Sequence, residues 1–352
     1  IPSEVRGEIT LYEIQLTRLQ NDRFAGAATW TYDPRNTFAG DPQVLPFGRE
    51  LQAVMEPALE AGAAGFVGVL NGYPGDSFSY YVPYDAVARP IPGVWISESS
   101  GRRLKQLLAA GHVTAHLIVD ARTEAATTYN IVGELPGADD EVVIIGTHHD
   151  GPWASAVEDA SGMALVLAQA AYWSQIPAPE RPHVLLFLVN SGHMYGGAGV
   201  HAFIEQHKSE LGRVVLEVHL EHAAAEFTEK DGILAATGEP EPRWWFTSRI
   251  PELEQTVREA IEAEDLQRSM ILRPDIFAPY PTTDGGPFHA EGVPLVNYLT
   301  APFYLFDAMD TMDKIHRASL VPITRAAARI VESTRGTSAT QMRTGIVEGA
   351  RA

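Results

Sequence analysis

The stretch VVIIGTHHDGPWASAVEDASGMALVLAQA, from Val142 to Ala170, decides the fold. An apolar strand leads into two histidines and an aspartate, and a short loop then leads to an acidic pair that opens a helix. The charged and imidazole side chains around this one turn are His148, His149, Asp150, Glu158 and Asp159. Because so many polar groups must be satisfied together, we interpret the turn as a metal site.

The composition excludes several classes of protein. The chain has 352 residues, 45% of them hydrophobic, which is enough for two domains or one large domain with an insertion. A net charge of −19 without a basic cluster argues against a nucleic-acid partner. The absence of cysteine excludes thiolate ligands, so any metal must be held by His, Asp or Glu.

The longest apolar runs, such as HVLLFLVN, have the length of a strand, and we expect no membrane partner. The start at Ile1 does not resemble a signal peptide, so the expected location is cytoplasmic. A chain that begins at Ile can have lost its true start, and the completeness of the N-terminus is left open. So is the oligomeric state.

The segment from Ala61 to Asp120 predicts a small β-rich layer with one or two helices. Ser99 or Ser100 is expected to cap a helix over Arg102–Ala110, and Gly111 to end it. A strand is expected in HVTAHLIVD, which follows Gly111. The polar stretch DARTEAATT then marks the crossing into a second unit.

The second unit alternates apolar strands with helices. Its strands are YNIVGELPG, EVVIIGTHHD, HVLLFLVN and RVVLEVHLEH, with helices expected near 160–173, 198–208 and 320–333. Strands that are apolar throughout predict an α/β fold, with a mixed, mostly parallel sheet covered by helices on both faces. Such sheets bind ligands at the carboxyl ends of their strands. Three of these ends carry polar clusters, at 148–150, 190–193 and 219–222.

The order of seven motifs resembles the co-catalytic zinc aminopeptidase family, which includes bacterial leucyl aminopeptidases, glutamate carboxypeptidases and glutaminyl cyclases. The motifs are YNIVGELPG, IIGTHHD, EDASGMALVLAQA, VLLFLVNSGHMYGGAG, VVLEVHLEH, TTDGGPFHAEGVPLVNY and DTMDKIH. The resemblance covers roughly residues 128–332. Residues 61–120 look like the protease-associated domain that many members carry. We therefore expect a protease-associated-like domain at 1–126, a catalytic domain at 127–335, and a loosely held polar tail at 336–352.

The resemblance implies a set of metal ligands. His148 falls at the first histidine ligand, and Asp150 at the aspartate that orients it. The metal-bridging aspartate of the family falls at Glu158, and a further aspartate ligand at Glu221. Glutamate binds the same ions as aspartate with one more methylene of reach, so both positions remain usable.

The other half of the family's site is different here. The adjacent pair of glutamates, base and then ligand, falls at His193 and Met194, and the last histidine ligand falls at Phe306. Asp307 could replace that ligand only if its loop shifted. Thioether and phenyl groups do not hold a hard or borderline divalent ion, so the second metal position is expected to be lost.

We therefore predict one divalent transition metal per chain, bound by His148, Glu221, and Glu158 or His193. Zinc is expected first, with manganese, iron and cobalt left open. The expected catalytic residues are His193, as the general base, and Asp150, through its orientation of His148.

The substrate-binding candidates are Asp284, Trp153 and His222. Relatives usually show Ser-Asp-His where this chain has Thr-Asp-Gly at 283–285, and Trp153 directly follows the metal loop. Strand alternation places His222 on the face opposite Glu221, unless the strand has ended.

Structural roles are expected for the remaining histidines near the motifs, which are His149, His219 and His289. Trp244, Trp245 and Tyr195 are likewise more typical of core packing than of a pocket.

The leading hypothesis is a metal-dependent hydrolase of a small amide or peptide-like substrate, in which His193 takes a proton from water. Met194 and Phe306 stand where the family has metal ligands near the substrate's free amino end, so an unusual, non-peptide amide is an open choice of substrate. One alternative keeps the fold and the metal in a cyclase, lyase or isomerase. Another is a non-catalytic binding homologue without a metal.

Overall fold

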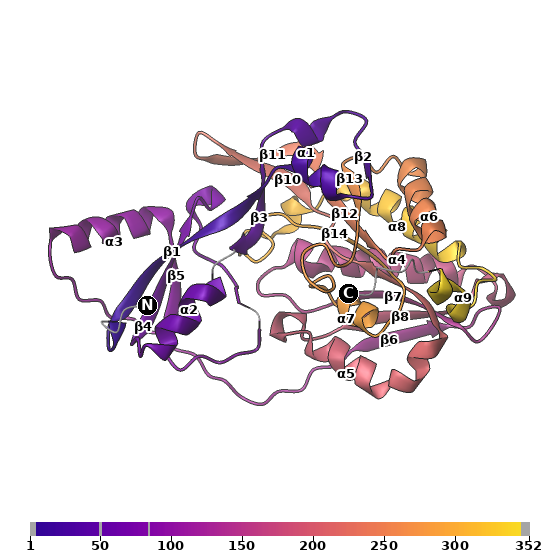
Figure 1. Cartoon of the computed structure of the whole chain (residues 1–352), viewed down its shortest axis with the longest axis horizontal. Helices are drawn as coiled ribbons and strands as arrows, with labels where there is room; N and C mark the ends of the chain where they lie inside the picture. Colours follow the sequence, from indigo (N-terminus) through magenta and orange to yellow (C-terminus); the bar gives the residue numbers. More distant parts are fainter. Residues whose placement is uncertain (1–4, 49–50, 84, 346–352) are drawn as a thin grey trace.

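An eight-stranded sheet built from apolar, β-branched segments forms the centre of the molecule (Figure 1). The computed structural model describes residues 5–48, 51–83 and 85–345. In spatial order the strands are β2 (Trp30–Tyr32), β13 (Ser269–Leu272), β12 (Arg243–Thr247), β14 (Leu295–Thr300), β9 (Val214–Leu220), β7 (Val142–His148), β8 (Val184–Asn190) and β6 (Ile131–Leu135). The pairs β13–β12, β14–β9, β9–β7 and β7–β8 are parallel, and the other three are antiparallel. The predicted mixed, mostly parallel sheet is confirmed.

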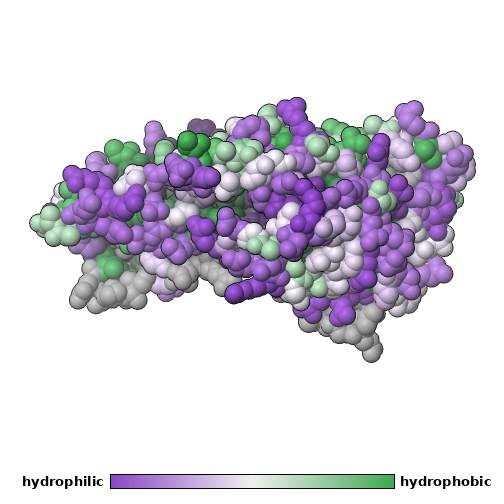
Figure 2. Space-filling model, turned by 90° about the horizontal axis from the view of Figure 1, so that it is seen from above, coloured by the Kyte–Doolittle hydropathy of each residue, from purple (hydrophilic) through white to green (hydrophobic). Residues whose placement is uncertain are grey.

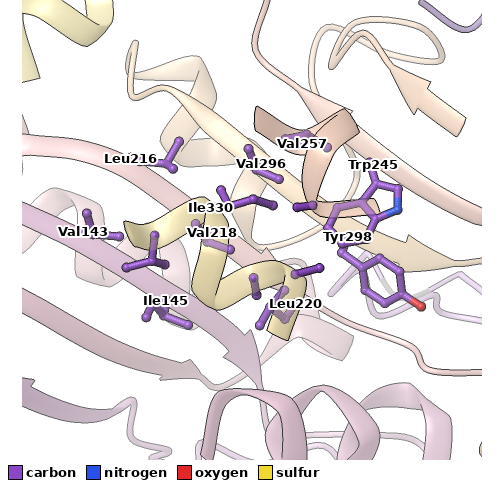
Figure 3. Close-up of a cluster of buried hydrophobic side chains, with 14 of the residues drawn as sticks. Val143, Ile145, Leu216, Val218, Leu220, Trp245, Val257, Val296, Tyr298 and Ile330 are labelled. Carbon is purple, nitrogen blue, oxygen red and sulfur yellow. The ribbon is translucent and has the colours of Figure 1, made fainter. Parts of the chain in front are cut away.

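Helices cover both faces of this sheet. Alternate residues of each strand point to opposite sides, and both sets of side chains are apolar and need covering. Val143 and Ile145 of β7 face a cluster shared with the helices α4, α6 and α8 (Figure 3). Ile144 faces the other way, toward α5 and α7. The bounds are α4 (Gly162–Ser174), α5 (Ala198–Gln206), α6 (Pro251–Ala263), α7 (Gly285–Ala290) and α8 (Arg317–Glu332). Burial on both faces explains why these strands read as continuous apolar runs.

The carboxyl ends of β7, β8 and β9 meet at one edge of the sheet. In the parallel register His148 lies beside Asn190, and Gly146 lies beside His219. The three polar clusters predicted at strand ends are therefore brought together by the sheet itself.

A second, four-stranded sheet is formed by the N-terminal segment. Its order is β3 (Gln43–Gly48), β1 (Ile9–Leu19), β4 (Gly65–Asn71) and β5 (Gly93–Ser97), with the helices α2 (Leu51–Glu60) and α3 (Glu98–Ala110). Gly101 allows α3 to approach β4 closely, since a Cβ there would lie 2.4 Å from a methyl carbon of Val69. Strand β2 comes from the same segment but pairs with β13 of the large sheet. The domain boundary at residue 126 stays a prediction.

The N-cap prediction for α3, Ser99 or Ser100, is wrong by two or three residues. The side chain of Ser97 accepts a hydrogen bond from the backbone N–H of Ser100, so the helix begins at Glu98. Strand β5 ends directly at Ser97, which leaves no room for a later cap. Gly111 ends the helix as predicted.

The strand expected after Gly111 does not form. Residues 112–130 lack regular structure and run as a long connection from α3 to the large sheet (Figure 1). Ile118 and Val119 are exposed, and no described strand pairs with this segment. An apolar run without a partner strand has no ladder to join.

The loosely held tail is also wrong for residues 339–344, which form the helix α9 (Ala339–Thr344). Ser338 and Gln341 form a reciprocal capping box, and Met342 is buried in the main core. The guanidinium of Arg343 donates to backbone carbonyls that include those of Leu211 and Val214.

The remaining elements are the short helix α1 (Asn21–Phe24) and the hairpin of β10 (Ala225–Lys230) and β11 (Ile233–Pro240). Among the described residues, no helix combines the length and apolarity needed to cross a membrane. Hydrophilic side chains predominate on the face seen in Figure 2, as the charge of −19 implies.

Glu241, between β11 and β12, is a buried acid that should make stability depend on pH. It is 3% exposed and accepts a hydrogen bond of 3.0 Å from Gln43. Burial, reinforced by Glu226 and opposed by Arg268, raises its pKa from 4.5 to about 8. The folded state therefore holds this proton more tightly than the unfolded chain does, and folding loses stability as pH rises from 4.5 to about 8.

We expect Glu241→Gln to become progressively more stable than the wild type over this pH range, because the neutral amide can still accept from Gln43. Differential scanning calorimetry at several pH values measures the difference in Tm. Glu239→Gln, which removes the ion pair with Arg35, should show no such gain. A Tm difference for Glu241→Gln that is independent of pH would contradict the assignment.

Candidate active site

His148 ends strand β7 and is fully buried. Its Nδ1 donates to the backbone carbonyl of Asp150 at 3.0 Å, since a carbonyl can only accept. This fixes the tautomer and leaves the Nε2 lone pair free, 3.4 Å from Oε1 of Glu158. Such a ring is oriented as a metal ligand would be.

Asp150 holds the neighbouring loop in place. Its carboxylate accepts the backbone N–H groups of His193 and Met194, at 3.0 and 2.9 Å. The carboxylate lies 3.8 Å from Nδ1 of His148, and only the backbone oxygen of Asp150 bonds that ring. Asp150 therefore positions both histidines, one through its main chain and the other through its side chain.

Glu158 lies on the turn Ala156–Ser161 and is 1% exposed. The carboxylate of Asp310 holds this turn by accepting the backbone N–H groups of Val157 and Glu158, at 2.8 to 3.1 Å. The Glu158 carboxylate itself meets imidazole nitrogens: Oε1 lies 3.4 Å from Nε2 of His148, and Oε2 lies 2.5 Å from Nε2 of His222.

Asp159, the next residue, is already satisfied. Its carboxylate accepts from the Thr147 hydroxyl and from the backbone N–H groups of Gly162 and His222. Asp159 therefore fixes the loops around the site, whereas Glu158 keeps both oxygens for another partner.

His222 lies inside the site, and the sequence assigned it only a substrate contact. Strand β9 ends at Leu220, and the positive φ of 38° at His222 turns the ring back toward Glu158. Its Nδ1 donates to the carbonyl of Thr300 at 2.8 Å, and its Nε2 lies 2.5 Å from Oε2 of Glu158. The early strand end was the exception that the alternation argument left open.

Glu221 is held in place by His219, which is buried between Glu221 and Glu217. His219 lies 2.9 Å from Oε1 of Glu221 through Nε2, and 2.9 Å from Glu217 through Nδ1. The other oxygen of Glu221 lies 3.6 Å from Nε2 of His222. One oxygen of Glu221 thus faces the site while His219 fixes the other.

His193 follows strand β8 and pairs with Asp284. Its Nδ1 donates to the Asp284 carboxylate at 2.9 Å, which leaves Nε2 as the basic nitrogen, 3.8 Å from Oε1 of Glu158. Its ring stacks on that of His148, with centroids 4.1 Å apart and planes inclined by 12°. Gly285 follows Asp284 because a Cβ there would lie 2.9 Å from Oε2 of Glu217.

An apolar wall replaces the polar groups expected for a second metal. Val157, Met194 and Phe306 are buried in one hydrophobic cluster. Asp307, the possible substitute ligand, instead accepts from the Ser77 hydroxyl and the backbone N–H of Met309.

The polar atoms of this site fit a divalent metal. Within residues 5–48, 51–83 and 85–345, the buried atoms His148 Nε2, His222 Nε2 and both Glu158 oxygens have no hydrogen-bond partner outside this group, in which His222 Nε2 lies 2.5 Å from Glu158 Oε2. Two overlapping groups have ligand atoms within 4.8 Å of one another, one with His148, Asp159 and His222 and one with His148, His193 and Glu221. Imidazole with carboxylate suits zinc, and also manganese, iron or cobalt.

The buried carboxylates raise the pKa values of the histidines next to them. Burial lowers the pKa of His222, but the carboxylates of Glu158 and Glu221 outweigh it and raise the value to about 9. Glu217 and Glu221 likewise raise the pKa of His219 to about 10 against the effect of burial.

Other residues singled out from the sequence lie elsewhere. Trp153 is 47% exposed and does not line the cleft described below. His149 points away, with Nε2 against the carbonyl of Tyr129, and His289 contacts Ser248. Trp245 belongs to the main core.

The site opens into a cleft of about 690 Å³. Glu158, His193, Glu221, His222 and Asp284 line its polar end. The cleft provides room for a small organic substrate beside these groups.

Comparison with known families supports the architecture. A family model described as Peptidase family M28 matches residues 130–331. Probable leucine aminopeptidase 2 of Aspergillus oryzae is 30% identical over 190 residues, which cover 51% of this chain and 36% of the relative. The corresponding Aspergillus fumigatus protein is 41% identical over 88 residues, or 23% of this chain and 17% of the relative. The chain thus matches about a third or less of the length of these curated relatives.

Solved structures show the same fold. A Peptidase M28 precursor from Shewanella amazonensis has a TM-score of 0.63 at 17% identity, covering 96% of this chain and 70% of that one. A zinc aminopeptidase from Bacillus subtilis has a TM-score of 0.61 at 17% identity, covering 96% and 78%.

We expect His148→Ala to lose its metal, because it removes a buried ligand nitrogen. Plasma mass spectrometry of wild-type protein purified without chelator should find about one equivalent of a divalent transition metal. The matched control is His149→Ala, which removes the adjacent ring on the opposite side and should retain the metal. Equal metal content in both variants would contradict the ligand assignment.

Proposed function

This chain belongs to peptidase family M28, as the seven motifs predicted, and on that premise we propose that it is a metal-dependent hydrolase of small amide or peptide-like substrates. We further propose one metal per chain and His193 as the general base. The observation that carries the proposal is the convergence of His148, Glu158 and His222, whose buried nitrogen and oxygen atoms face one another beside the His193–Asp284 pair.

His148, Glu158 and His222 are the proposed main ligands, with Glu221 within reach through its free oxygen. Asp159 is less suited, because its carboxylate already accepts three hydrogen bonds. An ion bound there would polarise the substrate carbonyl and lower the pKa of water.

His193 supplies the proton transfers. Its Nε2 takes a proton from the attacking water, whose oxygen bonds to the carbonyl carbon. As the carbon–nitrogen bond breaks, the same nitrogen returns the proton to the leaving amine, and a carboxylic acid and an amine result. Asp284 accepts from Nδ1 throughout, which holds the ring in place and stabilises the imidazolium.

The Met194 and Phe306 wall supports the choice of one ion. A second ion on that side would face a thioether and a phenyl ring, which do not replace its water shell. The proposed metal is therefore confined to the side of His148 and His222.

We expect His193→Ala to lower kcat by about 10²- to 10⁴-fold, the usual contribution of a general base, while metal content stays near that of the wild type. Turnover of amide substrates and plasma mass spectrometry measure the two quantities. His289 lies outside the site, so the control variant His289→Ala should leave kcat and metal content unchanged. Near-wild-type kcat in His193→Ala would remove His193 as the base.

The substitution Asp284→Asn tests whether Asp284 controls the pKa of the proposed base His193, through the pH dependence of kcat/KM. Burial and His148 lower the pKa of His193, but Asp284 and Glu158 outweigh them, and the net pKa is raised. Loss of the Asp284 charge should lower that pKa, so the acidic limb of the kcat/KM profile should move to lower pH while kcat falls. An unmoved acidic limb would show that the pair does not control the titrating group.

A further inference from the structure

Glu217 and His219 on strand β9 are buried, ionisable residues that the proposed reaction does not use. Both side chains are 0% exposed. Glu217 lies beside Ile144 in the parallel register, so it points to the face of the sheet that packs against α5 and α7. A charged side chain placed in such a layer costs several kcal/mol unless it is paired. The contacts that offset this cost lead from Glu217 to the proposed metal site.

His219 bridges two carboxylates through its two ring nitrogens. Its Nδ1 lies 2.9 Å from Oε1 of Glu217, and its Nε2 lies 2.9 Å from Oε1 of Glu221. The three residues alternate along one strand and therefore point to the same face. The backbone N–H of Glu221 donates to the carbonyl of Tyr298 at 3.0 Å, which extends the pairing of β9 with β14 as far as Glu221. The sheet itself thus sets both contacts of the ring.

The contact with His219 divides the two oxygens of Glu221 between two tasks. Oε1 is held by the ring, while Oε2 lies 3.6 Å from Nε2 of His222 in the site. Glu221 also belongs to a group with His148 and His193 whose ligand atoms lie within 4.8 Å of one another. A carboxylate held in this way presents a single oxygen to an ion.

Two glycines leave the space that Glu217 and His219 occupy. A Cβ at Gly146 of strand β7 would lie 2.8 Å from Oε1 of Glu217 and 3.0 Å from Nδ1 of His219. A Cβ at Gly285 of helix α7 would lie 2.9 Å from Oε2 of Glu217 and 2.9 Å from Cβ of His219. Any larger residue at either position would displace the carboxylate or the ring. The neighbouring strand and helix are therefore both shaped around this pair.

We propose that Glu217 and His219 are positioning residues for the metal: Glu217 holds the His219 ring, and the ring holds Glu221 so that it binds the ion through Oε2. The inference rests on the proposed metal site and adds to it two residues that do not touch the ion. Partners of metal ligands contribute about 10- to 100-fold to metal affinity or activity. A purely structural role would instead affect the stability of the fold and leave metal affinity unchanged.

Glu217→Gln tests the inference with little change in side-chain volume. A neutral amide holds the ring less firmly than a carboxylate does, so Glu221 should become less well fixed. We expect the Kd for zinc to rise about tenfold or more, measured by competition with a chromophoric chelator. The matched control is Glu134→Gln on strand β6, an exposed glutamate of the same sheet, which should keep the wild-type Kd. An unchanged zinc Kd in Glu217→Gln overturns the inference.

Gly146→Ala displaces the pair without removing a polar group, and cobalt reports the result. The visible absorption of bound Co²⁺ depends on the arrangement of its ligands, so the spectrum should change in both Gly146→Ala and Glu217→Gln. Gly133→Ala on strand β6 is the control, because a Cβ there would lie 4.0 Å from Cβ of Phe187, an ordinary contact. Circular dichroism checks that each variant is folded. If Gly146→Ala does not fold, Glu217→Gln alone decides the test.

The outcomes separate this inference from the proposed function. A lower Tm in Glu217→Gln, with the wild-type zinc Kd and cobalt spectrum, would reduce Glu217 to a structural role and overturn the inference while the proposed metal site stands. A weaker zinc Kd together with a changed cobalt spectrum would uphold it. Wild-type protein that binds neither zinc nor cobalt would overturn both the metal site and the inference.

Discussion

The buried group of charges at the carboxyl ends of β7, β8 and β9 is the constraint on which the rest of the structure depends. Five carboxylates and four histidines, all at most 7% exposed, lie within this region: Glu158, Asp159, Glu217, Glu221, Asp284, His148, His193, His219 and His222. A buried charge without a partner costs several kcal/mol, so each group must be placed against a donor, an acceptor or a cation. Most are placed in this way by protein atoms. Around Glu158 two imidazoles and a carboxylate face one another across the site, and this point is therefore the one suited to an ion.

The turn that carries Glu158 also separates the two environments of the site. Val157 packs with Met194 and Phe306, while the next side chain, Glu158, faces His148 and His222. Asp310 holds the backbone N–H groups of both residues and so fixes where the apolar side ends and the polar side begins. Asp310 fixes the backbone at Val157 and Glu158, and the side chains of these two consecutive residues point in different directions. The proposed ion would lie on the polar side of this boundary.

The sequence predicted what depends on periodicity and motif order. Apolar runs such as Val142–His148 gave the strands, and the order of motifs gave the fold and placed His148, His193 and Glu158 together. It failed where a single backbone angle or a missing neighbour decided the outcome. The sequence assigned His222 a substrate contact, whereas its positive φ turns the ring toward the proposed ligand Glu158. The exposed 112–120 run has strand-like composition but no partner strand, and composition alone does not supply one.

The histidine at position 193 and the hydrophobic residues beside it are physically linked. A carboxylate base carries its charge before the reaction begins, and burial against Met194 and Phe306 would raise its pKa. A histidine is neutral while it waits for a proton and becomes charged only afterwards, so it tolerates the apolar wall better. When Nε2 of His193 is protonated, its Nδ1 on the other side of the ring still donates to the Asp284 carboxylate at 2.9 Å. The proposed base, His193, therefore fits its apolar neighbours better than a carboxylate base would, because it is uncharged before it accepts a proton.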